Sequence, residues 1–153
     1  MPCIKCVHTP GYHNFVKFGF LGNTTLIYTS PAKTQDYNED GTKLANITIH
    51  VNELDKKPWI WVLDCGEMEL KHYTEISFTL GLLKLLSNDE KLQEVWIMRP
   101  NIWIRTTVNF LKTFYSAKIL NNIKYFEGTK MELLEQFQQT EIPISSIHWL
   151  IGQ

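Results

Sequence analysis

Residues 95–126 read VWIMRPNIWIRTTVNFLKTFYSAKILNNIKYF and contain two short apolar runs joined by a longer amphipathic segment. The first run, residues 95–98, predicts a buried strand that ends at Arg99-Pro100, because proline cannot continue a strand ladder. The last four residues, Ile123–Phe126, predict a second short strand. Between them, residues 102–115 have helical spacing, with an apolar arc wider than a surface helix usually carries. The segment therefore predicts a strand–helix–strand unit.

The same segment is basic. It contains no Asp or Glu and five basic residues, whereas the whole chain has 15 basic and 16 acidic residues, so the rest of the chain is acidic. On the predicted helix, Arg105 and Lys112 are seven residues apart and lie within about 20° of each other. We expect the apolar side of this helix to cover a core or a pocket and its basic side to face outward.

Periodicity and turn residues predict the other elements. Residues 47–51 alternate like a strand, but the longer apolar period over residues 44–54 favours a helix there. The further predictions are a hairpin in residues 15–30 around Gly22-Asn23, a central strand at 59–63, a helix at 73–86, and a helix at 131–137 opened by a Thr129/Glu132 capping box.

Length and composition set the broad class. At 153 residues, with 44% hydrophobic and 20% charged residues, the chain is expected to form one globular domain. Its net charge of −1 gives no reason to expect nucleic-acid binding. The N-terminus lacks the apolar core of a signal peptide, and no apolar run approaches the ~18–20 residues of a membrane span. An odd number of cysteines, three, favours a reducing compartment. We therefore expect a cytoplasmic protein.

The order of these elements resembles the CRAL-TRIO lipid-binding fold. VWIMRPNIWIRTTVNFLKTF, KILNNIKYFEG, TKMELLEQF and EIPISSI resemble its strand, gate helix, strand, helix and closing segment, and WIWVLD resembles its central strand. The resemblance covers residues 24–147, and the run around Arg99-Pro100 is most similar to the divergent branch found in Rho GTPase-activating proteins.

The resemblance implies an α/β fold, a mixed β-sheet flanked by helices, for residues 1–153 as a single domain. About a dozen residues precede residue 15, so the N-terminal helical lobe of the family is expected to be lacking, and residues 1–14 are expected to be flexible or loosely packed. A pocket without that lobe is expected to be shallower, open on one side or completed by a second subunit. Self-association as a homodimer is the expected way to cover the exposed surface.

The resemblance also implies a function: non-enzymatic binding, transfer or presentation of a lipid or other small hydrophobic molecule, in a pocket gated by the amphipathic helix. Arg105 and Lys112 are then expected to face an anionic membrane surface, which makes the protein peripheral to membranes. The alternative is a protein-interaction module whose partner is a small GTPase or another signalling protein. The expected ligand-binding residues are Trp59, Trp61, Trp103, Ile104, Val108, Phe110, Leu111, Phe114 and Tyr115.

No nucleotide-binding or hydrolase motif is present, so we predict no catalytic residue and no cofactor. Cys3-x-x-Cys6, with His8 and His13, contains four zinc ligand types, but the spacing after Cys6 fits no common zinc pattern. A loosely packed terminus with dispensable cysteines is favoured over a zinc site, and no metal is predicted. Cys65 is expected to be a buried structural thiol rather than a nucleophile. The isolated residues His50, His72 and His148 are expected to be surface or hydrogen-bonded residues.

Overall fold

A five-stranded mixed sheet forms the centre of the molecule, as seen in a computed structural model that describes residues 2–34, 42–69, 72 and 76–153. The strands lie in sequence order: β1 (Val16–Leu21), β2 (Thr24–Thr29), β3 (Trp59–Asp64), β4 (Leu92–Met98) and β5 (Ile123–Phe126). The β1–β2 pair is antiparallel, and the other pairs are parallel. The predicted α/β fold with a mixed sheet is confirmed.

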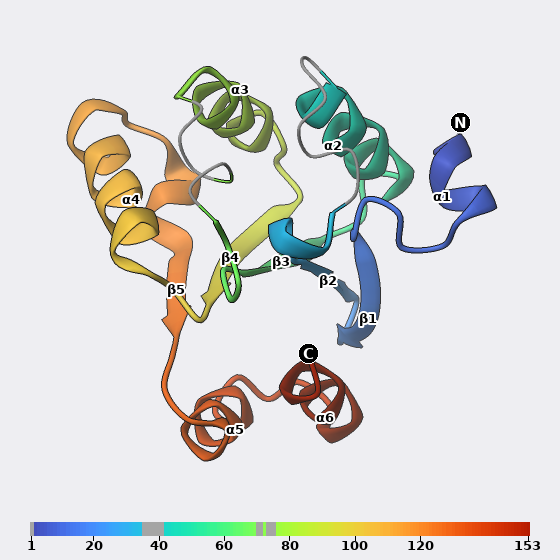
Figure 1. Ribbon diagram of the computed structural model, residues 1–153, viewed down its shortest axis with the longest axis vertical. Coiled ribbons are helices and arrows are strands. Elements are labelled where there is room, and N and C mark those ends of the chain that lie inside the picture. Colours follow the sequence, from blue (N-terminus) through green and yellow to red (C-terminus); the bar gives the residue numbers. More distant parts are fainter. Residues whose placement is uncertain (1, 35–41, 70–71, 73–75) are drawn as a thin grey trace.

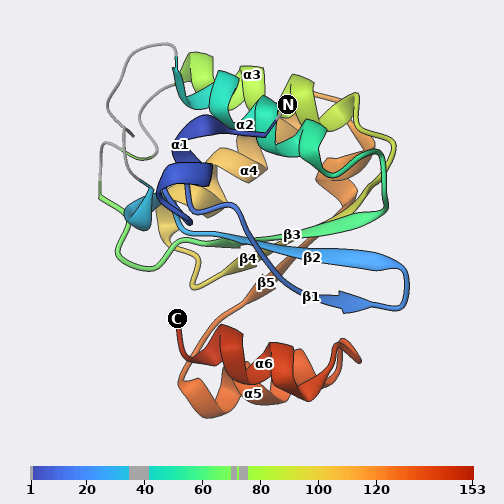
Figure 2. The same ribbon diagram turned by 90° about the vertical axis from the view of Figure 1, so that its right-hand side faces the viewer.

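Helices cover both faces of this sheet. The helices in chain order are α1 (Ile4–His8), α2 (Thr42–Glu53), α3 (Ile76–Ser87), α4 (Ile102–Phe114), α5 (Lys130–Gln138) and α6 (Ile144–Ile151), with 3-10 turns η1 (Pro31–Lys33) and η3 (Lys118–Asn122). Figure 2 shows α2, α3 and α4 on one side of the sheet and α5 and α6 on the other. Because β2 to β5 follow one another in a single direction, crossovers of the same hand place their three helices on the same face.

The central strands are apolar on both faces because each face is covered by helices. In β3, Trp59 and Trp61 join the core beneath α3 and α4, whereas Ile60 and Val62 join the core above α5 and α6. The side chains of β4 alternate in the same way, and Val95 lies in the core beneath α3 and α4. The expectation that residues 59–63 form the centre of the sheet is confirmed.

Local signals set most element ends. Gly22 has φ 59° in the two-residue turn that joins β1 to β2, a conformation that glycine adopts without cost. Asn101 caps α4, its side chain accepting a hydrogen bond from the Ile104 N–H at 2.9 Å. Thr129 and Glu132 form the predicted capping box of α5.

Two differences from the predicted elements concern the ends of the chain. The predicted start of α3, residues 73–75, lies outside the described residues. At the C-terminus, the sequence predicts only a closing segment around Ile142-Pro143, but residues 144–151 form α6, which packs with α5. At the N-terminus, the described residues 2–14 lie beside α2 (Figure 1), with Cys3 and His13 buried.

Candidate ligand cavity

A cavity lies between the sheet and the layer of α2, α3 and α4. Its volume is about 140 Å³. β2 and β3 form its floor through Thr29 and Trp61, and the helices contribute Ile47, Leu82 and Ile104 to its walls. Since α2, α3 and α4 are the three crossover helices, the cavity is a product of the topology: it occupies the space that they leave above the parallel strands.

The cavity floor is apolar because its polar atoms satisfy one another. The indole N–H of Trp61 donates to the Thr29 hydroxyl at 2.9 Å, and both residues are buried. With this hydrogen bond made, the Trp61 ring faces the cavity as an apolar surface. A molecule bound there is held mainly by burial of its own apolar surface.

One cation lies in the cavity wall. The Lys43 ammonium on α2 lies 5.4 Å from the centre of the Phe78 ring on α3, and both residues line the cavity. The pair belongs to a mainly apolar wall that also includes polar residues such as Asn46 and Thr107.

The nine residues predicted to bind ligand are divided among different environments. Trp61 and Ile104 line the cavity, whereas Val108 and Leu111 are buried in the core beneath α4. Trp59 is buried and donates its indole N–H to Asp89 at 3.0 Å. The aromatic residues of α4 and its end lie outside the cavity and are exposed: Trp103, Phe110, Phe114 and Tyr115.

The two predicted membrane-facing cations differ in their surroundings. Arg105 forms an ion pair with Glu127, and its guanidinium lies 4.3 Å from the centre of the Tyr125 ring. Lys112 is exposed in the last turn of α4. The buried residues of α4 lie between the basic pair and the exposed aromatic residues, so the two groups flank the buried line of the helix.

Sequence reasoning missed several cavity residues. Phe15 and Met68 line the cavity from outside the regular elements, where no periodicity marks them, and His72 lines it as well. Ile47 was one of the apolar positions that predicted α2, but that period does not distinguish a cavity wall from a core contact.

Polar side chains form two further groups, and the first surrounds Asp64, the last residue of β3. Asp64 is buried and accepts hydrogen bonds from the Tyr28 hydroxyl at 2.6 Å and the Gly66 N–H at 2.9 Å, with Arg99 at 3.7 Å. Burial, together with the charge of Asp64, raises the pKa of the Cys65 thiol to about 12, as expected for a structural thiol.

His13 and His50, which line the cavity, also belong to a second group. Together with Cys3 and Cys6, they place their ligand atoms within 4.8 Å of one another, the single group of this kind among the described residues.

Comparison with known families agrees with this geometry. The sequence profile of the CRAL/TRIO domain matches residues 28–145, over three quarters of the chain. The chain belongs to the CRAL/TRIO domain family. The resemblance stated from the sequence is thereby confirmed, and the family-level expectation is binding of small lipophilic molecules. No curated protein is significantly similar to this CRAL/TRIO chain. Among its described residues, none of the helices combines the length and the apolar character that crossing a bilayer demands.

Proposed function

We propose that this CRAL/TRIO domain binds a small lipophilic molecule, without chemical conversion, in the cavity beneath α4. The observation that carries the proposal is the apolar cavity itself, floored by Trp61 and walled by Leu82 and Ile104 from the crossover helices. Lys43 and Phe78 complete the wall on the side of α2 and α3.

The size of the cavity narrows the ligand class. A volume of about 140 Å³ is below the roughly 300–1,000 Å³ of pockets for drug-sized ligands, and is similar to a cavity that holds one benzene ring. A short acyl or isoprenoid chain therefore suits the cavity as it stands. A phospholipid requires α4 to move away from the sheet, which is the gate movement that the resemblance to the CRAL/TRIO family implies.

The test is a cavity-filling substitution with a matched control on the same helix. Thr107 on α4 lines the cavity, whereas Thr113 is exposed on that helix. Thr107→Phe is expected to fill the cavity and to remove lipophilic molecules that copurify with the wild type. Thr113→Phe, the same change on the outer surface, is expected to retain them. Native mass spectrometry followed by solvent extraction measures both.

Two results contradict the proposal. One is equal recovery of the same lipophilic molecule from Thr107→Phe and from wild type, because binding then occurs elsewhere. The other is a wild-type protein that carries no such molecule and gains none when incubated with short fatty acids.

A second candidate function is peripheral contact with a membrane at the cytoplasmic surface. The exposed aromatic residues of α4 favour it: Trp103 is 55% exposed, Phe110 51% and Phe114 68%. Aromatic side chains concentrate at membrane interfaces because their rings lie at the level of the lipid headgroups. The same surface is open to a partner protein such as a small GTPase, or to a second copy of the chain.

A further inference from the structure

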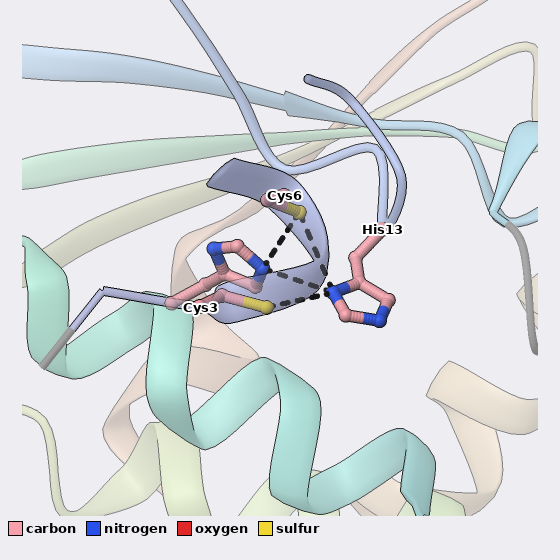
Figure 3. A group of neighbouring side chains, drawn as sticks. Cys3, Cys6 and His13 are labelled. Carbon is pink, nitrogen blue, oxygen red and sulfur yellow. Dashed lines mark hydrogen bonds between the residues drawn. The ribbon is translucent and has the colours of Figure 1, made fainter. Parts of the chain in front are cut away.

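Four potential metal ligands from the N-terminal segment and α2 converge on one point. The His13 Nδ1 atom lies 3.4 Å from the Cys3 Sγ, 3.5 Å from the Cys6 Sγ and 3.2 Å from the His50 Nε2. The Cys6 Sγ lies 3.4 Å from the His50 Nε2. Figure 3 shows the side chains of Cys3, Cys6 and His13 directed toward one another, with dashed lines for these contacts.

These distances match a tetrahedral zinc site. With Zn–S near 2.3 Å and Zn–N near 2.0–2.1 Å, tetrahedral geometry places ligand atoms about 3.3–3.8 Å apart. Four of the six ligand–ligand distances are 3.2–3.5 Å, and all six lie within 4.8 Å. We propose that Cys3, Cys6, His13 and His50 form a Zn²⁺ site. Two sulfur and two imidazole ligands form a donor set typical of zinc.

Hydrogen bonding among the four side chains does not account for this arrangement. The His13 Nδ1 atom faces two sulfur atoms and one nitrogen within 3.5 Å. A ring nitrogen has either one hydrogen or one lone pair in the ring plane, so it makes one good contact of this kind and not three. A cation at the common point accepts a lone pair from each of the four atoms at once.

Local structure brings the N-terminal ligands together. Cys3 is the N-cap of α1 and Cys6 lies three residues on, so one helical turn places both on the same side. Gly11 has φ 80°, a left-handed conformation suited to glycine, in the turn that brings His13 back to them. His50 comes from α2, 37 residues beyond His13.

Glu53 contacts two of the four ligand residues, His50 and Cys3, as carboxylates commonly do in zinc sites. Its Oε2 atom lies 3.2 Å from the His50 Nδ1, on the ring nitrogen opposite the ligand atom, and its Oε1 accepts the Cys3 N–H at 2.6 Å. A carboxylate at this position fixes the tautomer of the histidine and increases its basicity as a ligand. One residue of α2 thereby orients ligands from both segments.

The site is structural rather than catalytic, because four protein ligands leave no open coordination position. Cys3, His13 and His50 are buried. The bound metal fastens residues 3–13 to α2 and thereby fixes His13 and His50, which also line the cavity. Three of the four ligands precede residue 28, where the CRAL/TRIO match begins, and the fourth, His50, lies within the matched residues.

The test uses Zn²⁺ alone, on the full chain purified under reducing conditions without a polyhistidine tag. Elemental analysis is expected to find one zinc per chain. After zinc is replaced by Co²⁺, the visible spectrum is expected to show the bands of tetrahedral Co²⁺ with thiolate ligands. This second measurement needs no substitution, so it holds even where a variant does not fold.

Matched variants locate the metal. His13→Ala and Cys6→Ser are expected to lose the zinc, whereas His8→Ala and Cys65→Ser keep it, since His8 and Cys65 lie outside the group. Glu53→Gln is expected to bind zinc about 10–100-fold more weakly in a competition titration with a chelating dye.

Several results overturn the proposal. These are wild-type protein with less than a tenth of a zinc per chain and no tetrahedral Co²⁺ spectrum, another metal in stoichiometric amount, or equal loss of zinc from His8→Ala and His13→Ala. None of these outcomes depends on whether the cavity binds a lipophilic molecule.

Discussion

At the scale of single residues, Trp61 tests the cavity floor. It is 2% exposed, and its indole N–H donates a hydrogen bond to the Thr29 hydroxyl. Trp61→Ala is expected to lower the free energy of unfolding by about 3–5 kcal/mol, because it removes a large packed ring and leaves a void. Trp103→Ala, on the exposed side of α4, is expected to cost less than about 1 kcal/mol. Urea unfolding measures both, and equal losses contradict this placement of Trp61.

Cys65 makes stability depend on alkaline pH. Burial raises its pKa from 9.0 to about 12 in the folded protein, so the unfolded chain loses the proton first as the pH rises. Stability from this thiol is therefore complete below pH 9 and falls above it, by about 1 kcal/mol between pH 9 and pH 10. Between pH 9 and pH 10, the free energy of unfolding is expected to fall by about 1 kcal/mol more in the wild type than in Cys65→Ala. An equal decrease in the two proteins contradicts this role of Cys65.

The sequence predicted some residue environments and not others. Trp61 was expected in a core or pocket floor because it lies in the middle of an apolar run, and burial of that run is what the structure shows. His50 was expected to be a surface or hydrogen-bonded residue; it is buried and contacts Glu53, but its contact with His13 was not predicted. Packing of the N-terminal segment on α2 creates this contact, and the spacing of residues along the sequence does not predict it.

At the scale of elements, the exposed aromatic residues of α4 predict how the helix meets a membrane. Phe110→Ser/Phe114→Ser is expected to weaken binding to phosphatidylserine-containing vesicles roughly tenfold or more, because two partly exposed rings leave water on binding. Met131→Ser, an exposed apolar residue of α5 on the opposite layer, is the matched control and is expected to have no effect. Vesicle sedimentation measures the three proteins.

The charge contribution of α4 is expected to be smaller. Lys112→Glu is expected to weaken binding to anionic vesicles in a salt-dependent way, since each basic residue near such a surface contributes about 1 kcal/mol. Equal binding by wild type and the double phenylalanine variant removes the membrane-facing role of this helix and favours a protein partner for the same surface.

Periodicity predicted the elements that bury a continuous face. The strands at 59–63 and 95–98 and the helices α2, α4 and α5 all have long apolar periods or a capping box, and each was found. The short helices α1 and α6 were not predicted. The first has five residues and the second begins after Pro143 without a side-chain cap, so tertiary packing rather than local signals stabilises them.

At the scale of the whole molecule, metal removal tests the attachment of the N-terminal segment. A site saturated at a thousand times its dissociation constant contributes about 4 kcal/mol, or a shift in the unfolding midpoint of about 10 °C for a chain of this size. We expect a strong chelator to lower the midpoint of the wild type by this amount and to leave Cys3→Ser/Cys6→Ser unchanged. Calorimetry measures both, and an equal shift in the two proteins excludes a metal held by these cysteines.

The architecture as a whole was accessible from the sequence because the order of its elements resembles one family. The cavity was not, since its walls combine side chains from three crossover helices with loop residues such as Phe15 and Met68. The predicted gate helix contributes Ile104 and Thr107 to the cavity, while its aromatic residues face outward. A helical period shows that a face is apolar; it does not distinguish a face that covers a cavity from one that meets an outside partner.

The most direct measurement of the central claim is methyl nuclear magnetic resonance during titration with octanoate, a short anionic fatty acid. The account predicts saturable shifts at the methyl groups of Ile47, Leu82 and Ile104, which line the cavity. It predicts no shift at Leu133 or Leu150, which are buried on the opposite face of the sheet. Thr107→Phe is expected to abolish the shifts. Unchanged cavity methyl groups, or saturable shifts confined to the face of α5 and α6, contradict the account.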